Sequence, residues 1–486
     1  MKHFVTLLFG LAFSLGVFAQ TSVQKAVEAW DSKEPLGGSV WGLCVKDLQG
    51  NILVQHDAAR RMAPASNRKL VTTGVALHAF GPEYRFRTGI GYTGEIREDG
   101  TLEGDVYIIG GGDPTIGAKD SIAYKPDALF WKWKTLLKEA GIQRIHGRIV
   151  GDGTAFEGHL EHASWAYDDL GTYYGTGGNA LCFYENTIDF DVAATAEGQP
   201  VEFRQTYPET PWLQLNNYGF TGPAGTGNSL YLFTTDLAPY AELRGSFATD
   251  RSPKTESFSN KYGALTCAYY FWRNLKDTGW EVTGGYADID RHGYLRGSDF
   301  VPAEKAGAPR EIGFTESPAL VDIARITNWR SDNFYAEAFL RAMGEAASGV
   351  AVYDSCLVAE SVVLKDLGLT LDQISLADGS GLSRMNYISP EWMTDYLLAM
   401  RESPAFEAFL STIPHPGQGT LRTVKMDPSR ICMKSGSMDG TLCYSGYILD
   451  ASGRPQKAFS FLTNNSVAKA SQVRSAMVQI LSLLIE

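Results

Sequence analysis

The stretch Ala65-Ser66-Asn67-Arg68-Lys69-Leu70-Val71 places a serine and a lysine three residues apart at the start of an apolar run. A proline precedes this stretch and Gly81-Pro82 follows it, so the sequence predicts a helix between these two breaks. Residues i and i+3 of a helix share a face, which brings the Lys69 amine within reach of the Ser66 hydroxyl. An amine desolvated among apolar neighbours can take a hydroxyl proton, and we therefore interpret Ser66 as a nucleophile and Lys69 as its base.

The serine-x-x-lysine pattern is weak by itself. It recurs at Ser22 with Lys25 and at Ser466 with Lys469. Most copies of so short a pattern are ordinary pairs on a helix surface. Only partners elsewhere in the chain can distinguish the copy at Ser66.

Two polar triplets further along the chain supply such partners. Ser331-Asp332-Asn333 lies in a loop between two predicted helices, and Lys434-Ser435-Gly436 lies on a strand that a turn at Asp439-Gly440 is predicted to fold into a hairpin. Each triplet occurs once. Together with Ser66 and Lys69, in this order, they resemble the motif set shared by penicillin-binding proteins and class A β-lactamases.

The first part of this set suits acyl transfer. Ser66 attacks a carbonyl, and Lys69 takes the proton and returns it. Ser331 offers a second hydroxyl that can pass a proton to the leaving amine. Asn333 can hydrogen-bond both Lys69 and the backbone of the substrate.

The strand triplet suits recognition of a carboxylate. Lys434 holds positive charge beside it and polarises the Ser331 hydroxyl, and Ser435 can donate a hydrogen bond to it. Gly436 lets a substrate approach the strand closely.

Length and composition describe an ordinary globular protein. A chain of 486 residues exceeds one typical core, so two or three domains are expected. The formal net charge of −12 disfavours a nucleic acid or an anionic lipid surface as a partner.

Residues 1–19 contain a short apolar run that ends in a small-x-small pattern, which predicts a cleavable signal peptide and no stable membrane anchor. An uncleaved N-terminal anchor is the alternative.

No cofactor or metal is expected. The six cysteines form no C-x-x-C pair, and His159 and His162 have no apparent third ligand. Cys432 and Cys443 flank a turn and could pair across a hairpin, but buried free thiols explain the cysteines equally well.

The resemblance extends over nearly the whole chain beyond the predicted signal peptide. The chain resembles the class C low-molecular-mass penicillin-binding proteins, the serine D-Ala-D-Ala carboxypeptidases and endopeptidases of the penicillin-binding protein 4 type (peptidase family S13). The matching stretches are Gly104 to Tyr107, Gly112 to Pro114, Trp165 to Leu170, Asp378 to Arg384, Gly419 to Leu421 and Lys434 to Gly440.

This resemblance implies an α/β (α+β) fold. A transpeptidase-like domain at 20–84 and 300–486, with an antiparallel sheet flanked by helices, would be interrupted at 85–299 by inserted β-rich domains, which we expect to be two. It also implies an oxyanion hole formed by the backbone N–H groups of Ser66 and Ser437. Asp169 resembles an inserted-domain aspartate of the family that meets the amino group of the stem-peptide diamino acid.

Two positions depart from the family pattern. Ser435 replaces the usual threonine, which keeps the hydroxyl and loses a methyl group, so we expect activity to survive. Asp439 stands where relatives often have an uncharged residue.

Our hypothesis is a periplasmic serine D-Ala-D-Ala carboxypeptidase and D,D-endopeptidase that acts on peptidoglycan stem peptides and forms a covalent β-lactam adduct at Ser66. A β-lactamase-like hydrolase shares the motifs, but the long insertion argues against it. A catalytically silent peptidoglycan-binding protein is the other alternative, and the intact motifs argue against that.

Overall fold

The computed structural model describes residues 23–485, so the predicted signal peptide at 1–19 lies outside the described residues. The chain forms two compact units. The first comprises Met1–Pro82, Ala324–Asp332 and Ser361–Glu486, and the second comprises Glu83–Ile323 and Asn333–Glu360. The domain bounds predicted from the sequence remain a prediction.

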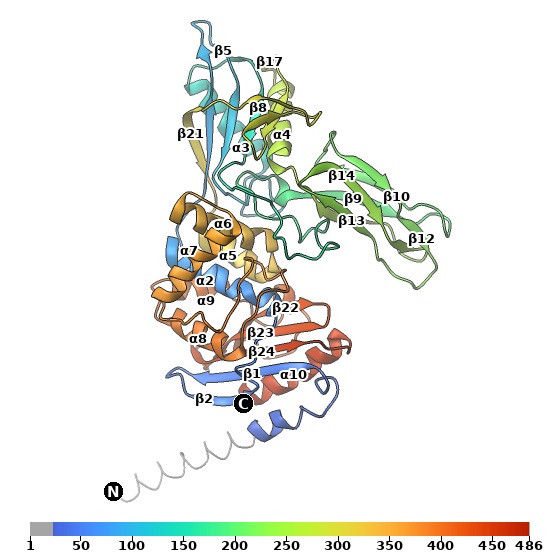
Figure 1. Cartoon of the computed structure of the whole chain (residues 1–486), viewed down its shortest axis with the longest axis vertical. Coiled ribbons are helices and arrows are strands. Elements are labelled where there is room, and N and C mark those ends of the chain that lie inside the picture. The colour runs from blue at the N-terminus through green and yellow to red at the C-terminus, as the bar shows by residue number, and fades with distance from the viewer. Residues whose placement is uncertain (1–22, 486) are drawn as a thin grey trace, which may run out of the picture. The chain divides into compact units, whose positions relative to one another are not determined.

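A five-stranded antiparallel sheet forms the centre of the first unit (Figure 1). Its strands, in spatial order, are β2 (Ile52–His56), β1 (Val40–Asp47), β24 (Pro455–Asn464), β23 (Thr441–Leu449) and β22 (Ile431–Met438). Every residue of β23 is buried, so both faces of the sheet are covered. The predicted antiparallel sheet with flanking helices is therefore confirmed.

Alternation along β1 explains the two layers of helices. Trp41, Leu43 and Val45 belong to a core that also contains the apolar side of α10 (Ala470–Ile485). Cys44 points the other way and accepts a hydrogen bond from Thr394 of α8. Successive side chains of a strand face opposite sides of a sheet, and this period of two places α10 on one face and α8 on the other.

The helices of the first unit surround this sheet. They are α2 (Arg68–Phe80), α8 (Pro390–Arg401), α9 (Phe406–Thr412) and α10, with short turns η1 (Ala65–Asn67), η3 (Thr327–Ser331) and η4 (Gly419–Leu421). Three further helices are α5 (Leu320–Ile326) and α7 (Tyr353–Asp366), which each cross a boundary between the units, and α6 (Asn333–Ser348) in the second unit.

The second unit is built on a seven-stranded mixed sheet. In spatial order its strands are β20 (Pro302–Lys305), β19 (Tyr294–Arg296), β18 (Tyr286–Ile289), β8 (Ile149–Asp152), β6 (Val106–Gly110), β3 (Arg87–Tyr92) and β21 (Arg310–Glu316). Beside it lies a smaller sheet of β17 (Glu281–Val282), β7 (Arg144–His146), β5 (Thr101–Glu103) and β4 (Glu95–Ile96). Helices α3 (Pro126–Glu139) and α4 (Gly263–Asp277) pack on each other through Phe130, Trp133 and Phe271.

Residues 187–259 of the second unit form three small sheets around a core of their own, which contains Phe190, Leu232 and Phe247. The sheets are β10 (Glu202–Tyr207), β9 (Thr187–Ala193) and β16 (Lys254–Ser259); β11 (Gln214–Asn217), β14 (Ala238–Arg244) and β13 (Tyr231–Thr235); and β12 (Phe220–Gly222) with β15 (Ser246–Ala248).

All six cysteines are buried free thiols. Cys432 is opposite Tyr447, and Cys443 is opposite Gly436, so the two cysteines of the hairpin do not face each other. Of the two explanations left open by the sequence, the structure shows the buried thiols.

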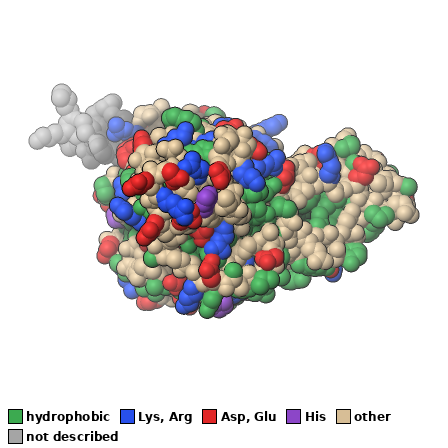
Figure 2. Space-filling view, turned by 90° about the horizontal axis from the view of Figure 1, so that it is seen from above, with side chains coloured by type: hydrophobic (Ala, Val, Ile, Leu, Met, Phe, Trp, Pro, Cys, Tyr) green, Lys and Arg blue, Asp and Glu red, His purple; other side chains and the backbone are tan. Residues whose placement is uncertain are grey.

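Figure 2 shows basic and acidic side chains interspersed on the face in view. Within residues 23–485, no single helix is long and apolar enough to cross a membrane. Helices α6 and α7 reach that length and apolar composition only when taken together, and the two are bent against each other.

Candidate active site

The Lys69 amine lies 3.0 Å from the Ser66 hydroxyl oxygen, within hydrogen-bond distance. Ser66 lies in the 3₁₀ turn η1 and Lys69 in the first turn of α2, as the i, i+3 spacing predicted. The Lys69 side chain is fully buried, whereas Ser66 is partly exposed. A lysine that solvent does not reach therefore faces a serine that a substrate can reach.

The backbone beside both candidate hydroxyls is strained. Ala65, which directly precedes Ser66, has φ of +46°, and Ser331, the last residue of the π-helical turn η3, has φ of +62°. Residues other than glycine rarely adopt this left-handed region, and such outliers gather at functional sites. One strained residue directly precedes the Ser66 hydroxyl, and the other carries the Ser331 hydroxyl.

The turn Asp378-Gly379-Ser380-Gly381 resembles the family in sequence, but its residue types did not reveal its role in the site. The carbonyl oxygen of Ser380 accepts a hydrogen bond from Lys69 Nζ at 2.7 Å. The carbonyl of Gly379 accepts another from Thr72 of α2, at 2.6 Å. Gly381 has φ of +82°, and a side chain there would collide with the Ala65 carbonyl. Main-chain atoms of the turn thus hold the start of α2.

Asp378 fixes this turn from inside. Its fully buried carboxylate accepts hydrogen bonds from Gly381 N at 2.8 Å, Ser383 N at 2.6 Å and Asn386 Nδ2 at 2.8 Å. A carboxylate with several such donors is well satisfied, and this one defines the direction of the peptide groups between it and Lys69. The glycine-rich pattern could have revealed the turn, but not which carbonyl meets Lys69.

Lys434 lies on β22 and reaches the second candidate hydroxyl. Its Nζ atom donates hydrogen bonds to Ser331 Oγ at 2.9 Å and to the Ser435 carbonyl at 2.6 Å. Burial lowers the pKa of Lys434 well below that of a free lysine, and the nearby charge of Lys69 lowers it further. The structure therefore brings Ser66, Lys69, Ser331 and Lys434 together in the first unit.

Gly436 allows β22 to approach Ser66. A Cβ atom at this position would lie 2.6 Å from the Pro64 carbonyl oxygen and 3.0 Å from the backbone nitrogens of Ser66 and Asn67. Real Cβ atoms do not come this close to backbone, so no larger residue fits without a shift. The absence of a side chain at Gly436 therefore allows β22 and η1 to lie in direct contact.

The exposed edge of β22 carries the other predicted oxyanion donor. This strand is the last in its sheet, and the N–H of Met433 points away from β23 to the Pro414 carbonyl. Backbone N–H groups two and four residues along a strand point the same way, so those of Ser435 and Ser437 also point to the free edge. Ser437 is exposed, and the Ser435 hydroxyl is held by the Thr420 hydroxyl at 2.6 Å.

Asn333 and Asp169 belong to the second unit. Asn333 begins α6, and its Nδ2 atom donates to the Tyr174 carbonyl at 2.9 Å. The Tyr174 hydroxyl donates to Asp169 Oδ1 at 3.1 Å. Burial, followed by the Asp169 charge, raises the pKa of Tyr174 to about 12, which keeps this hydroxyl protonated. Asn333 and Asp169 are thus both bonded to one residue of the segment 165–175.

The two histidines considered from the sequence do not act together. His162 contacts the Ser164 hydroxyl, whereas His159, Glu161 and Asp236 place one potential ligand atom each within 4.8 Å of one another. Asp236 already contacts His159 Nδ1, at 3.0 Å, and Lys261 lies 3.1 Å from Glu161. The Lys261 ammonium therefore balances the charge of Glu161.

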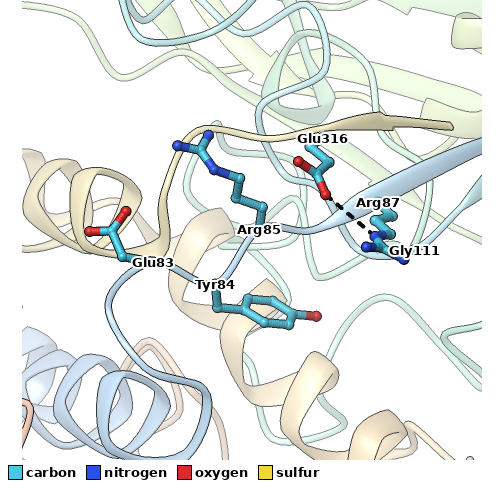
Figure 3. A pocket seen from close by; sticks show the side chains of 6 residues that line it. All are labelled: Glu83, Tyr84, Arg85, Arg87, Gly111 and Glu316. Carbon is cyan, nitrogen blue, oxygen red and sulfur yellow. Dashed lines mark ion pairs between the residues drawn. The ribbon is translucent and has the colours of Figure 1, made fainter.

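One pocket of the second unit, of about 450 Å³, contains no predicted site residue (Figure 3). An ion pair between Arg87 and Glu316, at 3.5 Å, crosses it, and Arg85 donates to the Ser317 carbonyl. Its lining residues are Glu83, Tyr84, Arg85, Arg87, Gly111 and Glu316.

A buried lysine at a partly exposed serine, with a second lysine on an edge strand bonded to a second hydroxyl in η3, is the arrangement typical of serine acyl-transfer enzymes that use a lysine base. Comparison with known families then gives the particular group. The family model of the D-Ala-D-Ala carboxypeptidase 3 (S13) family matches residues 23–484, and the chain belongs to this family. Its activity class is serine-type D-Ala-D-Ala carboxypeptidase.

Individual relatives agree with this assignment. A D-alanyl-D-alanine carboxypeptidase of Actinomadura sp. (strain R39) is 26% identical over 463 residues, which cover 91% of this chain and 81% of that protein. D-alanyl-D-alanine carboxypeptidase DacB of Haemophilus influenzae is 23% identical over 97% of this chain and 95% of its own. The crystal structure of penicillin binding protein 4 (dacB) from Haemophilus influenzae matches the fold with a TM-score of 0.77, at 22% identity, over 93% of this chain and 97% of that chain.

Proposed function

We propose that this carboxypeptidase acts on peptidoglycan stem peptides in the periplasm, with Ser66 as nucleophile and Lys69 as general base, and that it also cleaves D,D-crosslinks. The pair of short contacts in the first unit carries the proposal: Lys69 at Ser66, and Lys434 at Ser331. Each contact joins an amine to a hydroxyl, which is the requirement for moving a proton to and from a serine nucleophile.

Acylation needs one proton transfer in each direction. The Ser66 oxygen bonds to the carbonyl carbon of the penultimate D-alanine while its proton goes to Lys69. The oxyanion that forms accepts hydrogen bonds from the N–H groups of Ser66 and Ser437. The C–N bond then breaks, and the proton reaches the leaving D-alanine nitrogen through Ser331, which Lys434 polarises.

Deacylation reverses these roles. Water gives a proton to Lys69 and bonds to the acyl carbon, and the Ser66 oxygen leaves with the returned proton. In a crosslinked substrate the leaving amine belongs to a neighbouring stem peptide, so the same steps separate two peptides. Asn333 and Asp169 contact the bound peptide, with Asp169 facing the amino group of its diamino acid.

β-Lactams test the nucleophile. Opening of the lactam ring leaves the amine tethered to the acyl group, so the adduct at Ser66 persists, and a complexed β-lactam is described for the Haemophilus influenzae protein. Fluorescent penicillin should label the wild-type chain and fail to label Ser66→Ala. Labelling that persists in Ser66→Ala would place the nucleophile elsewhere.

Product analysis tests the reaction. Purified crosslinked peptidoglycan should yield free D-alanine and newly separated monomers. Retained binding without D-alanine release would indicate a silent wall-binding protein, and rapid turnover of a chromogenic cephalosporin would indicate a β-lactamase-like hydrolase. For location, a Ser66-labelled band in the periplasmic fraction, shortened by residues 1–19, is expected.

A further inference from the structure

The segment 153–183 connects β8 to a short 3₁₀ turn, η2 (Tyr184–Asn186), without a helix or strand of its own. Loops of this length within a compact unit usually serve function or are mobile. This one is tied down at several points. Arg341 of α6 donates to the carbonyls of Glu157 and His159, and the backbone N–H of Ser259 donates to the Gly171 carbonyl at 2.9 Å.

The contact that holds this segment nearest to Asp169 is made by a buried lysine, Lys261. Lys261 lies in the link between β16 and α4, and its side chain is fully buried. Its Nζ atom donates to the Gly175 carbonyl at 2.6 Å and forms an ion pair with Glu161 at 3.1 Å. Burial lowers the pKa of Lys261, and the Glu161 charge opposes this effect. A lysine is rarely buried so completely unless it is paired, so the pair itself needs a reason.

Two successive carbonyls show what the pair does. The Tyr174 carbonyl accepts from Asn333, and the next carbonyl, that of Gly175, accepts from Lys261. The Tyr174 side chain returns to Asp169 and bonds its carboxylate. The position of the Asp169 carboxylate therefore depends on residue 174, whose backbone is held between Asn333 and Lys261.

We propose that Lys261, paired with Glu161, is a positioning residue that fixes the Tyr174-Gly175 peptide and thereby sets the preference of the enzyme for stem peptides with a free amino group on their diamino acid. The inference rests on the proposed function, in which Asp169 faces that amino group. Lys261 touches no substrate. It acts through Gly175, Tyr174 and Asp169 in turn.

The test uses the full-length enzyme and two pentapeptides that differ only by acetylation of the diamino-acid amine. Lys261→Met combined with Glu161→Gln removes both buried charges at matched size, so no lone charge is left in the unit. The ratio of kcat/KM for the free-amine peptide to that for the acetylated peptide should fall about 10-fold, mainly through KM, as expected for losing one hydrogen bond to a charged group. Acylation by penicillin, which lacks this amine, should stay within about 3-fold of wild type.

Asp169→Asn supplies the decisive comparison. Asp169→Asn should lower the same ratio of kcat/KM values. Adding Asp169→Asn to the Lys261→Met, Glu161→Gln variant should lower this ratio no further, because the effects of residues that act through one group are not additive. Full additivity would show that Lys261 acts independently of Asp169 and would overturn the proposal, as would a wild-type ratio in the double variant.

A second buried lysine, paired with a partly exposed aspartate, controls for general stability. Lys46 is 6% exposed in its side chain and lies 2.5 Å from Asp395 in the first unit. Lys46→Met with Asp395→Asn should lower the melting temperature and leave the substrate ratio unchanged. Failure of the proposed function would show in the wild type, which would then release D-alanine from neither peptide, whereas failure of this inference shows only in the variants.

Discussion

Lys69 and Ser380 are joined by a hydrogen bond of 2.7 Å from the lysine amine to a main-chain carbonyl, although 311 residues separate them in the chain. A carbonyl can accept a hydrogen bond but has no proton to exchange. An N–H of Lys69 directed at Ser380 therefore fixes the direction of the amine beside the Ser66 hydroxyl. The turn at Asp378 therefore orients the Lys69 amine.

Asp378→Asn should disturb this orientation. The amide NH₂ would face the N–H of Ser383, which now donates to a carboxylate oxygen, and the turn must shift. We expect penicillin acylation to slow about 10- to 100-fold, in line with the cost of misplacing a catalytic group by about 1 Å. Stopped-flow kinetics would measure the acylation rate, and a thermal melt would measure the stability of the variant.

Asp450→Asn is the matched control, because Asp450 accepts backbone N–H bonds from Ser452 and Arg454 in an exposed turn of the same unit. It should acylate normally. A less stable Asp378→Asn enzyme that still acylated at the wild-type rate would contradict a role in orienting Lys69.

Gly436→Ala should separate β22 from Ser66. The added methyl group would lie 2.6 Å from the Pro64 carbonyl oxygen, so the strand or η1 must move. We expect a stability loss of about 1–3 kcal/mol, typical of overpacking, and strongly reduced labelling by fluorescent penicillin. Gly285→Ala, which has open space around its Cβ position, should change neither property. Normal labelling of Gly436→Ala would show that the close approach is dispensable.

The lowered pKa of Lys434 predicts a pH dependence of substrate binding. Only the protonated amine attracts a carboxylate, and a lowered pKa means that the proton is lost at a lower pH than in an exposed lysine. KM for a peptide ending in D-alanine should therefore rise as the pH increases through this lowered pKa. Lys434→Gln should have a higher KM that lacks this rise. The same pH profile in wild type and variant would assign the titration to another group.

Asp113 predicts a pH dependence of folding stability. Burial raises the pKa of this carboxyl to about 6, while Thr115 donates to it through its N–H and its hydroxyl. The folded state then binds more protons than the unfolded state between the ordinary pKa and about 6, so stability falls as the pH rises through this window and stays reduced above it.

Asp113→Asn keeps the acceptor for Thr115 and has no proton to lose. It should be more stable than wild type at pH 7.5, by up to about 3 kcal/mol, and close to wild type near pH 4. Urea denaturation across this range measures the difference. A difference that does not change with pH would show that Asp113 does not titrate there.

The elements with local signals were predicted well from the sequence. Gly81 ends α2 with φ of +84°, and Asp439-Gly440 turns β22 into β23. Glycine at a left-handed position can be recognised in the sequence as a turn or helix end without knowledge of the fold.

Contacts made by main-chain atoms left no such signal in the sequence. Lys69 bonds to the main-chain carbonyl of Ser380, and Lys261 bonds to that of Gly175. The side chains of Ser380 and Gly175 take no part in these two contacts, so the residue types in the sequence cannot predict them. The register of β22 against β23 likewise places Cys432 and Cys443 at positions that are not opposite each other. Their closeness to the turn in the sequence does not determine this register.

The buried cysteines have a practical consequence for work on this enzyme. Burial raises the pKa of every one of these thiols, so at neutral pH they are protonated and poor nucleophiles toward maleimides. The native chain should therefore accept a single engineered surface cysteine as a site-specific attachment point for a fluorophore or spin label. The six silent thiols are Cys44 and Cys356, each with a pKa of about 11, Cys432 and Cys443, each with a pKa of about 12, and Cys182 and Cys267, whose pKa values are raised further.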